Sequence, residues 1–239
     1  MIAYLKQQRP RKRQFRKSSS VLTVILAICC LIAGVLFLIL LELFLKRCSD
    51  IRTEFPLRAA QYAFYKTPST FGEKLAQAAE SLTRDSVIYD SSYFVLAYPG
   101  GDVPKNKGVC SDVVIRAYRK LGVDLQVEVH EDIKRAWASY PHMWGIEHQD
   151  PNIDHRRVFN LMVFFSRKGS ELSITANAKA YKPGDIVVWQ LKGGRGHIGV
   201  VSNRVNKDST CYPMVHNIGR GQNLEDVLFK WPIIGHYSY

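Results

Sequence analysis

Val21 to Leu41 is a run of 21 residues without a charged side chain. A helix rises 1.5 Å per residue, so about 20 apolar residues match a hydrocarbon core of ~30 Å. The apolar character continues to Leu45, and no small-x-small cleavage site follows it, unlike the shorter apolar core of a signal peptide. We therefore predict an uncleaved transmembrane anchor over residues 21–45, with an unusually long signal peptide as the alternative.

Basic residues are concentrated before this anchor. Residues 1–20 hold seven Lys or Arg and no acid, and removing those seven from the formal charge of +12 leaves +5 for the other 219 residues. The positive-inside rule then keeps the N-terminus in the cytoplasm and exports residues 46–239. Such a tail is explained as a topology signal, so we expect no nucleic-acid partner. In a bacterium the exported part would lie in the periplasm or at the outer face, where cysteines can oxidise.

The chain divides into four predicted parts. They are a basic cytoplasmic tail (1–20), the anchor (21–45), a juxtamembrane connector (46–69) and a folded domain (70–239). Hydrophobic residues make up 46% of the chain and charged residues 23%, which excludes global disorder.

Helix signals dominate the first half of the predicted domain. The capping box of Thr70 and Glu73 predicts a helix from residue 71 to about 84. Apolar residues at helical spacing, with Gly122 as a stop, predict a second helix that begins at or beside Cys110. Further helices are expected at about 127–139 and 157–166.

The second half has the pattern of strands. Runs of β-branched or aromatic residues, bounded by turn residues, lie at 186–189, 197–202, 212–218 and 233–239. Helices followed by an antiparallel sheet indicate an α+β domain.

The candidate chemistry centres on one cysteine and two histidines. A thiol at a helix start is exposed to unpaired N–H groups and the positive dipole end, which favour thiolate; the alternative is an ordinary buried cysteine. His197 opens a strand after a glycine-rich turn, and His216, next to Asn217, falls on the next strand. Cysteine catalysis needs a base near the sulfur and a third group that orients the base. Neighbouring antiparallel strands can bring His197 and His216 side by side, although each histidine alone is more readily explained as structural.

These residues resemble a known family. The pattern comprises Tyr98…Gly100-Gly101…Cys110-Ser111…Arg119…Gly122-Val123, Lys182-Pro183-Gly184-Asp185-Ile186-Val187 and His197-Ile198-Gly199-Val200-Val201. It is similar to the NlpC-type papain-fold cysteine peptidases, bacterial cell-wall amidases related to the CHAP amidohydrolases. Within that group the stretches at 100–104, 152–157 and 216–219 resemble an uncharacterised bacterial domain family. The resemblance covers about residues 70–239.

The resemblance implies a papain-like domain with nucleophile Cys110, base His197 and orienting residue His216. It places Tyr98 where a tyrosine often supports the oxyanion site, and Asn217 beside the orienting histidine is a further supporting residue.

The expected substrate is a peptidoglycan peptide, but the sequence departs from the family at its binding residues. The related peptidases commonly place Asp before the nucleophile, where it helps to hold the substrate amine; here Val109 precedes Cys110. Asp112 is a candidate replacement, with an early-turn carboxylate favoured by the helix dipole as the equal alternative. Arg156 and Arg157 are candidates for binding a substrate carboxylate or phosphate. The alternative is that they belong to a solvated helix start and form ion pairs there.

We expect no metal and no cofactor, because no metal-binding or phosphate-binding motif is present. Cys48 and Cys211 are a candidate disulfide. The sequence therefore predicts a membrane-anchored envelope thiol hydrolase whose oligomeric state is open. The alternative is a non-catalytic envelope binding module on the same fold. Acyl-group transfer is a third possibility, disfavoured because the histidine typically precedes the cysteine in those enzymes.

Overall fold

The structure is a computed structural model, and it describes residues 19–60, 62–63, 70–143, 145, 147–206 and 211–239. The chain forms two compact units, Met1–Ala59 and Ala60–Tyr239. Each unit is described by itself below.

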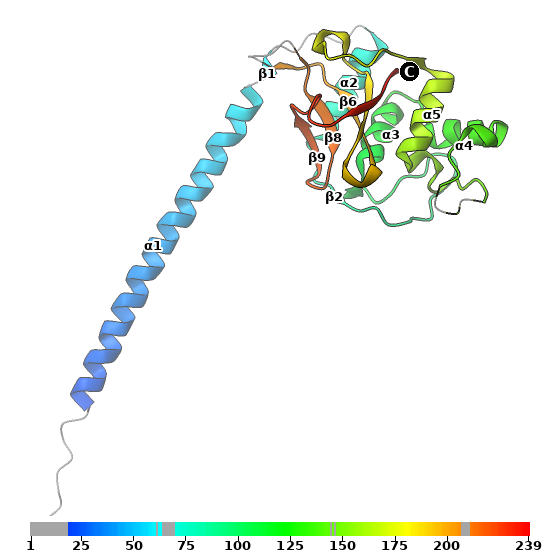
Figure 1. Cartoon of the computed structure of the whole chain (residues 1–239). Helices are drawn as coiled ribbons and strands as arrows, with labels where there is room; N and C mark the ends of the chain where they lie inside the picture. Colours follow the sequence, from blue (N-terminus) through cyan, green and yellow to red (C-terminus); the bar gives the residue numbers. More distant parts are fainter. Residues whose placement is uncertain (1–18, 61, 64–69, 144, 146, 207–210) are drawn as a thin grey trace, which may run out of the picture. The chain divides into compact units, whose positions relative to one another are not determined.

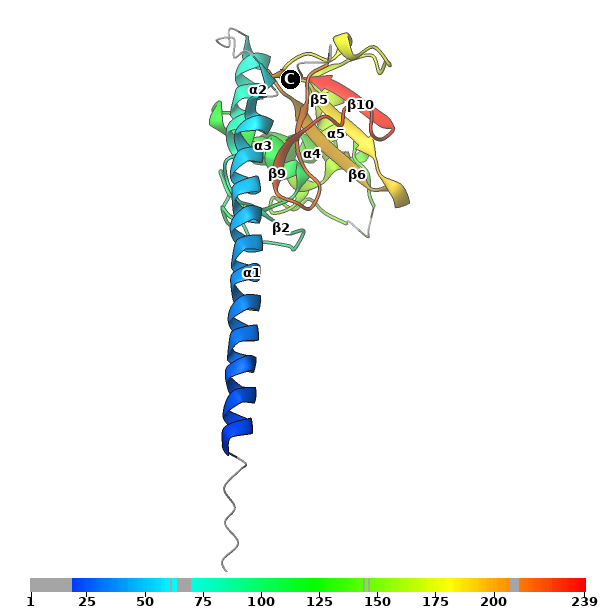
Figure 2. The same ribbon diagram turned by 90° about the vertical axis from the view of Figure 1, so that its left-hand side faces the viewer.

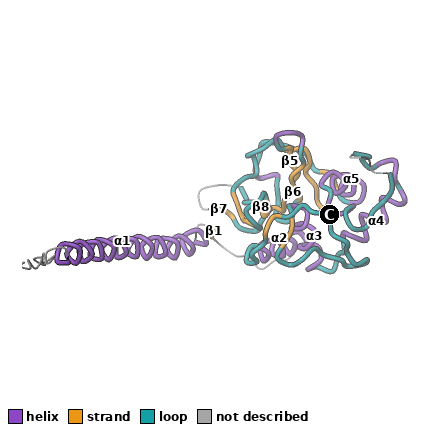
Figure 3. Tube along the Cα trace, turned by 90° about the horizontal axis from the view of Figure 1, so that it is seen from below, coloured by secondary structure: helices purple, strands orange, loops and turns teal. Residues whose placement is uncertain are grey.

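The described part of the first unit lies in helix α1 (Ser19–Ala60), which is continuous in Figures 2 and 3. Its segment Val24–Lys46 has a mean hydropathy of 3.3 and is the one helix of the described chain long and apolar enough to cross a membrane. This finding supports the predicted single-pass anchor. The helix also extends into the predicted connector. The basic tail before residue 19 lies outside the described residues, so the orientation of the anchor stays a prediction.

The second unit contains four α-helices among its described residues. They are α2 (Phe71–Leu82), α3 (Cys110–Lys120), α4 (Leu125–Arg135) and α5 (Val158–Lys168). The predicted capping box is confirmed, because the Thr70 hydroxyl accepts from the Glu73 N–H and the Glu73 carboxylate accepts from the Thr70 N–H. Gly122, with φ +84°, follows the end of α3 as predicted. The helix expected at 127–139 is shorter, because α4 ends at Arg135 and a separate 3₁₀ turn follows.

A six-stranded antiparallel sheet forms the other half of the unit, in the order β4-β10-β5-β6-β8-β9. Figure 1 labels β6, β8 and β9 of this sheet. Its strands are β4 (Ser170–Glu171), β5 (Ile186–Gln190), β6 (Gly196–Val201), β8 (Met214–Asn217), β9 (Gln222–Glu225) and β10 (Ile233–Ser238). The four predicted strands are its central four. Two short pairs lie apart from it: β2 (Ile88–Tyr89) with β3 (Lys107–Gly108), and β1 (Tyr62–Ala63) with β7 (Val205–Asn206).

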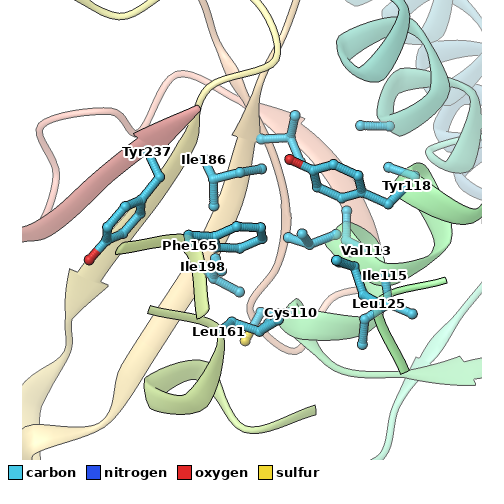
Figure 4. Packing of buried hydrophobic residues seen from close by; sticks show 14 of the residues in the cluster. Cys110, Val113, Ile115, Tyr118, Leu125, Leu161, Phe165, Ile186, Ile198 and Tyr237 are labelled. Carbon is cyan, nitrogen blue, oxygen red and sulfur yellow. The ribbon is translucent and has the colours of Figure 1, made fainter. Parts of the chain in front are cut away.

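The sheet buries both of its faces, as shown by the alternation of side chains along β6. Ile198 and Val200 belong to the large core that includes Cys110 and residues of α2, α3 and α5 (Figure 4). Val201 belongs to a second cluster with Trp189 and Tyr181 on the opposite face. Because successive side chains of a strand point to opposite faces, the two clusters mark the two sides of the sheet. The architecture is the predicted α+β fold with one candidate span.

Candidate active site

Cys110 is the first residue of α3, and its position is fixed from several directions. Its side chain is 4% exposed and lies beside Leu161 and Ile198 (Figure 4). The segment before it is held by Asn217, whose side-chain amide donates to the Gly108 carbonyl at 3.3 Å. Asn217 thus supports the cysteine through the backbone.

The helix start does not produce an acidic thiol. Burial raises the pKa of Cys110 to about 11, and the charge of Asp112 acts in the same direction. Backbone N–H groups of Ile198, Ser111 and Cys110 itself oppose this rise by stabilising the thiolate, but they do not overcome it. The sequence-based expectation of a thiolate favoured by the helix dipole is therefore wrong for this state, in which desolvation outweighs the dipole and the N–H donors.

The two candidate histidines lie side by side on adjacent strands, as the sequence predicted. His197 Nε2 lies 2.9 Å from His216 Nδ1, and His216 Nε2 lies 3.0 Å from the Glu225 carboxylate. Glu225 reaches His216 because β8 pairs with β9 so that His216 faces Asn223, two residues before Glu225 on the same face. The result is a continuous chain of three titratable groups.

Aromatic rings pack against the two histidines of this chain. The His197 ring stacks on Trp189 at a centroid distance of 5.5 Å, and Trp231 packs edge-on at 5.6 Å. Burial lowers the pKa of His197 to about 3, with the neighbouring His216 as a smaller cause. Burial also lowers the pKa of His216, while Glu225 opposes the change. Both rings are therefore neutral near pH 7.

Cys110 and His197 approach the same strand from different faces. The Cys110 sulfur accepts from the backbone of Ile198, the residue directly after His197. The side chains of these two strand residues point to opposite sides, with Ile198 in the Cys110 cluster and His197 against Trp189. Within the described residues, no hydrogen bond joins the Cys110 sulfur to either histidine ring. The structure thus brings together His197 and His216, and it brings the sulfur to the backbone beside them.

Tyr98, the predicted oxyanion tyrosine, contacts α4, whereas Tyr89 interacts electrostatically with Cys110. The Tyr98 hydroxyl donates to Glu131 at 3.1 Å, and its ring packs against His130 on α4. Tyr89 lies on β2, and burial followed by the charge of Cys110 raises its pKa. The oxyanion role of Tyr98 stays a prediction, and in this structure its hydroxyl is bonded to Glu131.

Asp112 and Arg156 form a buried ion pair with each other. The Arg156 guanidinium donates to both carboxylate oxygens of Asp112, at 2.9 and 3.1 Å, and both side chains are almost fully buried. Asp112 also accepts from the Val109 N–H at 2.7 Å, which caps the start of α3. The carboxylate and the guanidinium fork are thus paired with each other in this structure, and the substrate-binding role of Asp112 and Arg156 stays a prediction. Arg157 is half-buried and pairs with Asp154 at 3.4 Å.

Metal and disulfide predictions can be placed only in part. In the portion of the chain that the structure describes, no group of three or more His, Cys, Asp or Glu side chains is arranged to hold a metal ion. The Cys211 sulfur lies 3.7 Å from the Asp226 carboxylate. The side chain of Cys48 lies outside the described residues, so its pairing with Cys211 stays a prediction.

Comparison with known proteins identifies the family. Residues 76–239 match the family described as "Domain of unknown function (DUF1287)". The chain belongs to the DUF1287 family. A DUF1287-like relative, "Uncharacterized protein YijF" of Escherichia coli (strain K12), is 50% identical over 165 residues, which cover 69% of this chain and 80% of that protein. These matches confirm the predicted resemblance to an uncharacterised domain family.

Two solved structures are also similar to this DUF1287 chain. They are described as NlpC1 and NlpC2 from Trichomonas vaginalis, and each is 14% identical to it. The matches cover 73% and 74% of this chain, with TM-scores of 0.39 and 0.40. The chain spans about half the length of those two proteins, at 49% and 51%.

Sequence reasoning missed two residues of this DUF1287 site, Glu225 and Tyr89. Glu225 lies on a strand of polar residues, Gln222–Glu225, which carries no β-branched or aromatic signal. Tyr89 follows Ile88, and this pair of β-favouring residues was the one available signal for a short strand. Neither residue is near Cys110 in the sequence, so only the fold brings them to the site.

Proposed function

We propose that this chain is a membrane-anchored cysteine hydrolase of the cell envelope, an amidase or peptidase acting on peptidoglycan peptide amide bonds. The observation that carries the proposal is the position of the Cys110 sulfur. It lies at the start of α3, among backbone N–H donors, and at the strand that carries the His197–His216 pair. A nucleophile, oxyanion donors and an oriented base are the parts that acyl transfer requires.

In the proposed reaction the Cys110 sulfur attacks the amide carbonyl carbon while its proton passes to His197, a transfer that requires the His197 ring to turn from Trp189 to the Cys110 face of β6. The backbone N–H groups at the helix start stabilise the oxygen that becomes negative. Collapse of the intermediate breaks the C–N bond, and His197 returns the proton to the leaving amine. Water, deprotonated by His197, then hydrolyses the thioester and restores the thiol. The resting Cys110 thiol and His197 imidazole are both neutral, so they do not form a thiolate–imidazolium ion pair before the reaction. The thiol therefore loses its proton during the attack.

The same proposal places the domain outside the cytoplasmic membrane. The Val24–Lys46 segment is long and apolar enough to span the bilayer. Seven basic residues precede the apolar run, which favours a cytoplasmic N-terminus. The relative from Escherichia coli supports a bacterial setting. The substrate would then be the cell-wall peptides of the periplasm.

The test is release of new amines from purified cell-wall sacculi by the full chain in detergent. We expect release by the wild type, loss with Cys110→Ala, and wild-type release with Cys211→Ser, which removes a thiol outside the proposed machinery. Equal release by Cys110→Ala and the wild type would show that the sulfur is not the nucleophile.

A non-catalytic envelope binding module is the second candidate. It is favoured by one observation: the thiol has a raised pKa of about 11 and no hydrogen bond to an imidazole among the described residues. For this candidate, wild type and Cys110→Ala would both bind sacculi in a sedimentation assay, and neither would release amines. The two assays together separate the candidates.

A further inference from the structure

The carboxylate at the far end of the histidine pair has a defined geometry and no role in the reaction proposed above. Glu225 Oε2 lies 3.0 Å from His216 Nε2, and the Glu225 side chain is 38% exposed while His216 is 1% exposed. An exposed acid on an edge strand therefore reaches a buried imidazole, which in turn contacts His197 Nε2 at 2.9 Å.

Hydrogen-bond chemistry gives this chain a direction. An ionised carboxylate only accepts, and a neutral imidazole has one donor and one acceptor nitrogen. His216 Nε2 must then carry the proton that Glu225 accepts, which leaves His216 Nδ1 as an acceptor. His197 Nε2 must donate to that acceptor, and His197 Nδ1 is left with the lone pair.

The reverse order would satisfy the contact between the rings equally well. In that order His216 Nδ1 donates to His197 Nε2, and His197 Nδ1 carries a proton and cannot act as a base. This reverse order is disfavoured because it places the lone pair of His216 Nε2 against the negatively charged Glu225 carboxylate. The carboxylate is thus the group that distinguishes the two orders. Lys230 is the other charged group that influences His216, and its positive charge disfavours a protonated His216 ring.

We propose that Glu225 is a positioning residue that sets the tautomers of His216 and His197, so that His197 presents Nδ1 as its basic nitrogen. The catalytic consequence rests on the proposed function, whereas the tautomer assignment does not. Glu225 acts on His197 indirectly, through His216. In serine proteases a carboxylate plays the same part for a single histidine, and its amide variant loses rate through the wrong tautomer.

Nitrogen NMR of the full chain, labelled with ¹⁵N-histidine in detergent at pH 7, tests the assignment directly. We expect the wild type to show His197 and His216 protonated at Nε2 and unprotonated at Nδ1. Glu225→Ala removes the acceptor and should give a mixture of both orders. Asp226→Ala is the matched control, since it removes the neighbouring carboxylate, which contacts Asn206 rather than His216. A protonated His197 Nδ1 in the wild type, or unchanged tautomers in Glu225→Ala, would overturn the proposal.

Amine release from sacculi provides the second readout. Glu225→Ala should lower kcat by about 10-fold or more with KM nearly unchanged, and Glu225→Asp should recover part of the rate. Asp226→Ala should retain the wild-type rate. If the wild type releases no amines while the tautomers respond to Glu225→Ala, the proposed function fails and the positioning role stands. If the wild type is active but neither tautomers nor kcat respond, the positioning role alone fails.

Discussion

At the scale of single residues, burial decides the chemistry of Cys110. The helix start and three N–H donors favour a thiolate, yet a sulfur with 4% exposure loses more hydration than these groups replace. The same loss of hydration keeps the rings of His197 and His155 neutral, because burial lowers the pKa of each to about 3. The site therefore starts from uncharged partners.

The raised pKa predicts how Cys110 reacts with iodoacetamide. Because only the thiolate is alkylated, carbamidomethylation should be slow at pH 7 and should accelerate about tenfold per pH unit toward pH 10. Peptide mass spectrometry of the full chain measures modification at Cys110 separately from that at the other cysteines. Rapid alkylation at pH 6, saturating before pH 8, would contradict a buried, neutral thiol.

At the scale of secondary-structure elements, one buried ion pair joins the start of α3 to the 3₁₀ turn Asp154–Arg156. Asp112 caps the helix that presents Cys110, and Arg156 holds that cap while its guanidinium also donates to the Ser92 carbonyl at 3.2 Å. The Ser111 hydroxyl adds a bond to the Arg156 carbonyl at 2.8 Å. These contacts fix the nucleophile relative to the loop that precedes α5.

Arg156→Ala should therefore destabilise the domain by ~3–5 kcal/mol, since it leaves the Asp112 charge buried and unpaired. Lys134→Ala is the control, because its pair with Glu131 is largely exposed and such pairs contribute ~0–1 kcal/mol. Denaturant unfolding followed by tryptophan fluorescence compares the two. Equal losses in both variants would show that the buried pair does not stabilise α3.

At the scale of the whole molecule, stability should depend on pH through the buried histidines. His155 and His197 have pKa values of about 3 in the fold, against about 6.5 in an unfolded chain. Between these values the unfolded chain binds more protons, so their contribution to stability is complete above about pH 6.5 and is lost as the pH falls toward 3.

We expect the Tm of the full chain in detergent to fall as the pH is lowered from 6.5 to 4.5, a window above the ordinary titration of carboxylates. Tryptophan fluorescence reports unfolding of the domain, because Trp189 and Trp231 pack on the histidine pair. His197→Gln should show a smaller fall, and His148→Gln, at an exposed position, should match the wild type. A Tm that is constant over this window would contradict the prediction.

Much of the fold could be read from local patterns. The span, the capped helix α2, the helix starting at Cys110 and the four central strands follow from hydropathy, capping and periodicity, which act over a few neighbouring residues. Polar β9 gave no such signal, and α4 ended four residues before its predicted limit, with a separate 3₁₀ turn covering Trp137–Ser139.

The sequence by itself determined the candidate membrane span, the α+β class, and the positions of Cys110 at a helix start and of His197 and His216 on adjacent strands. Only the tertiary structure decided that the sulfur is buried with a raised pKa, that Asp112 is held by Arg156, and that Glu225 completes the histidine chain. The physical reason is that hydration and charge pairing depend on groups brought together from distant parts of the chain, whereas helix and strand signals depend on near neighbours.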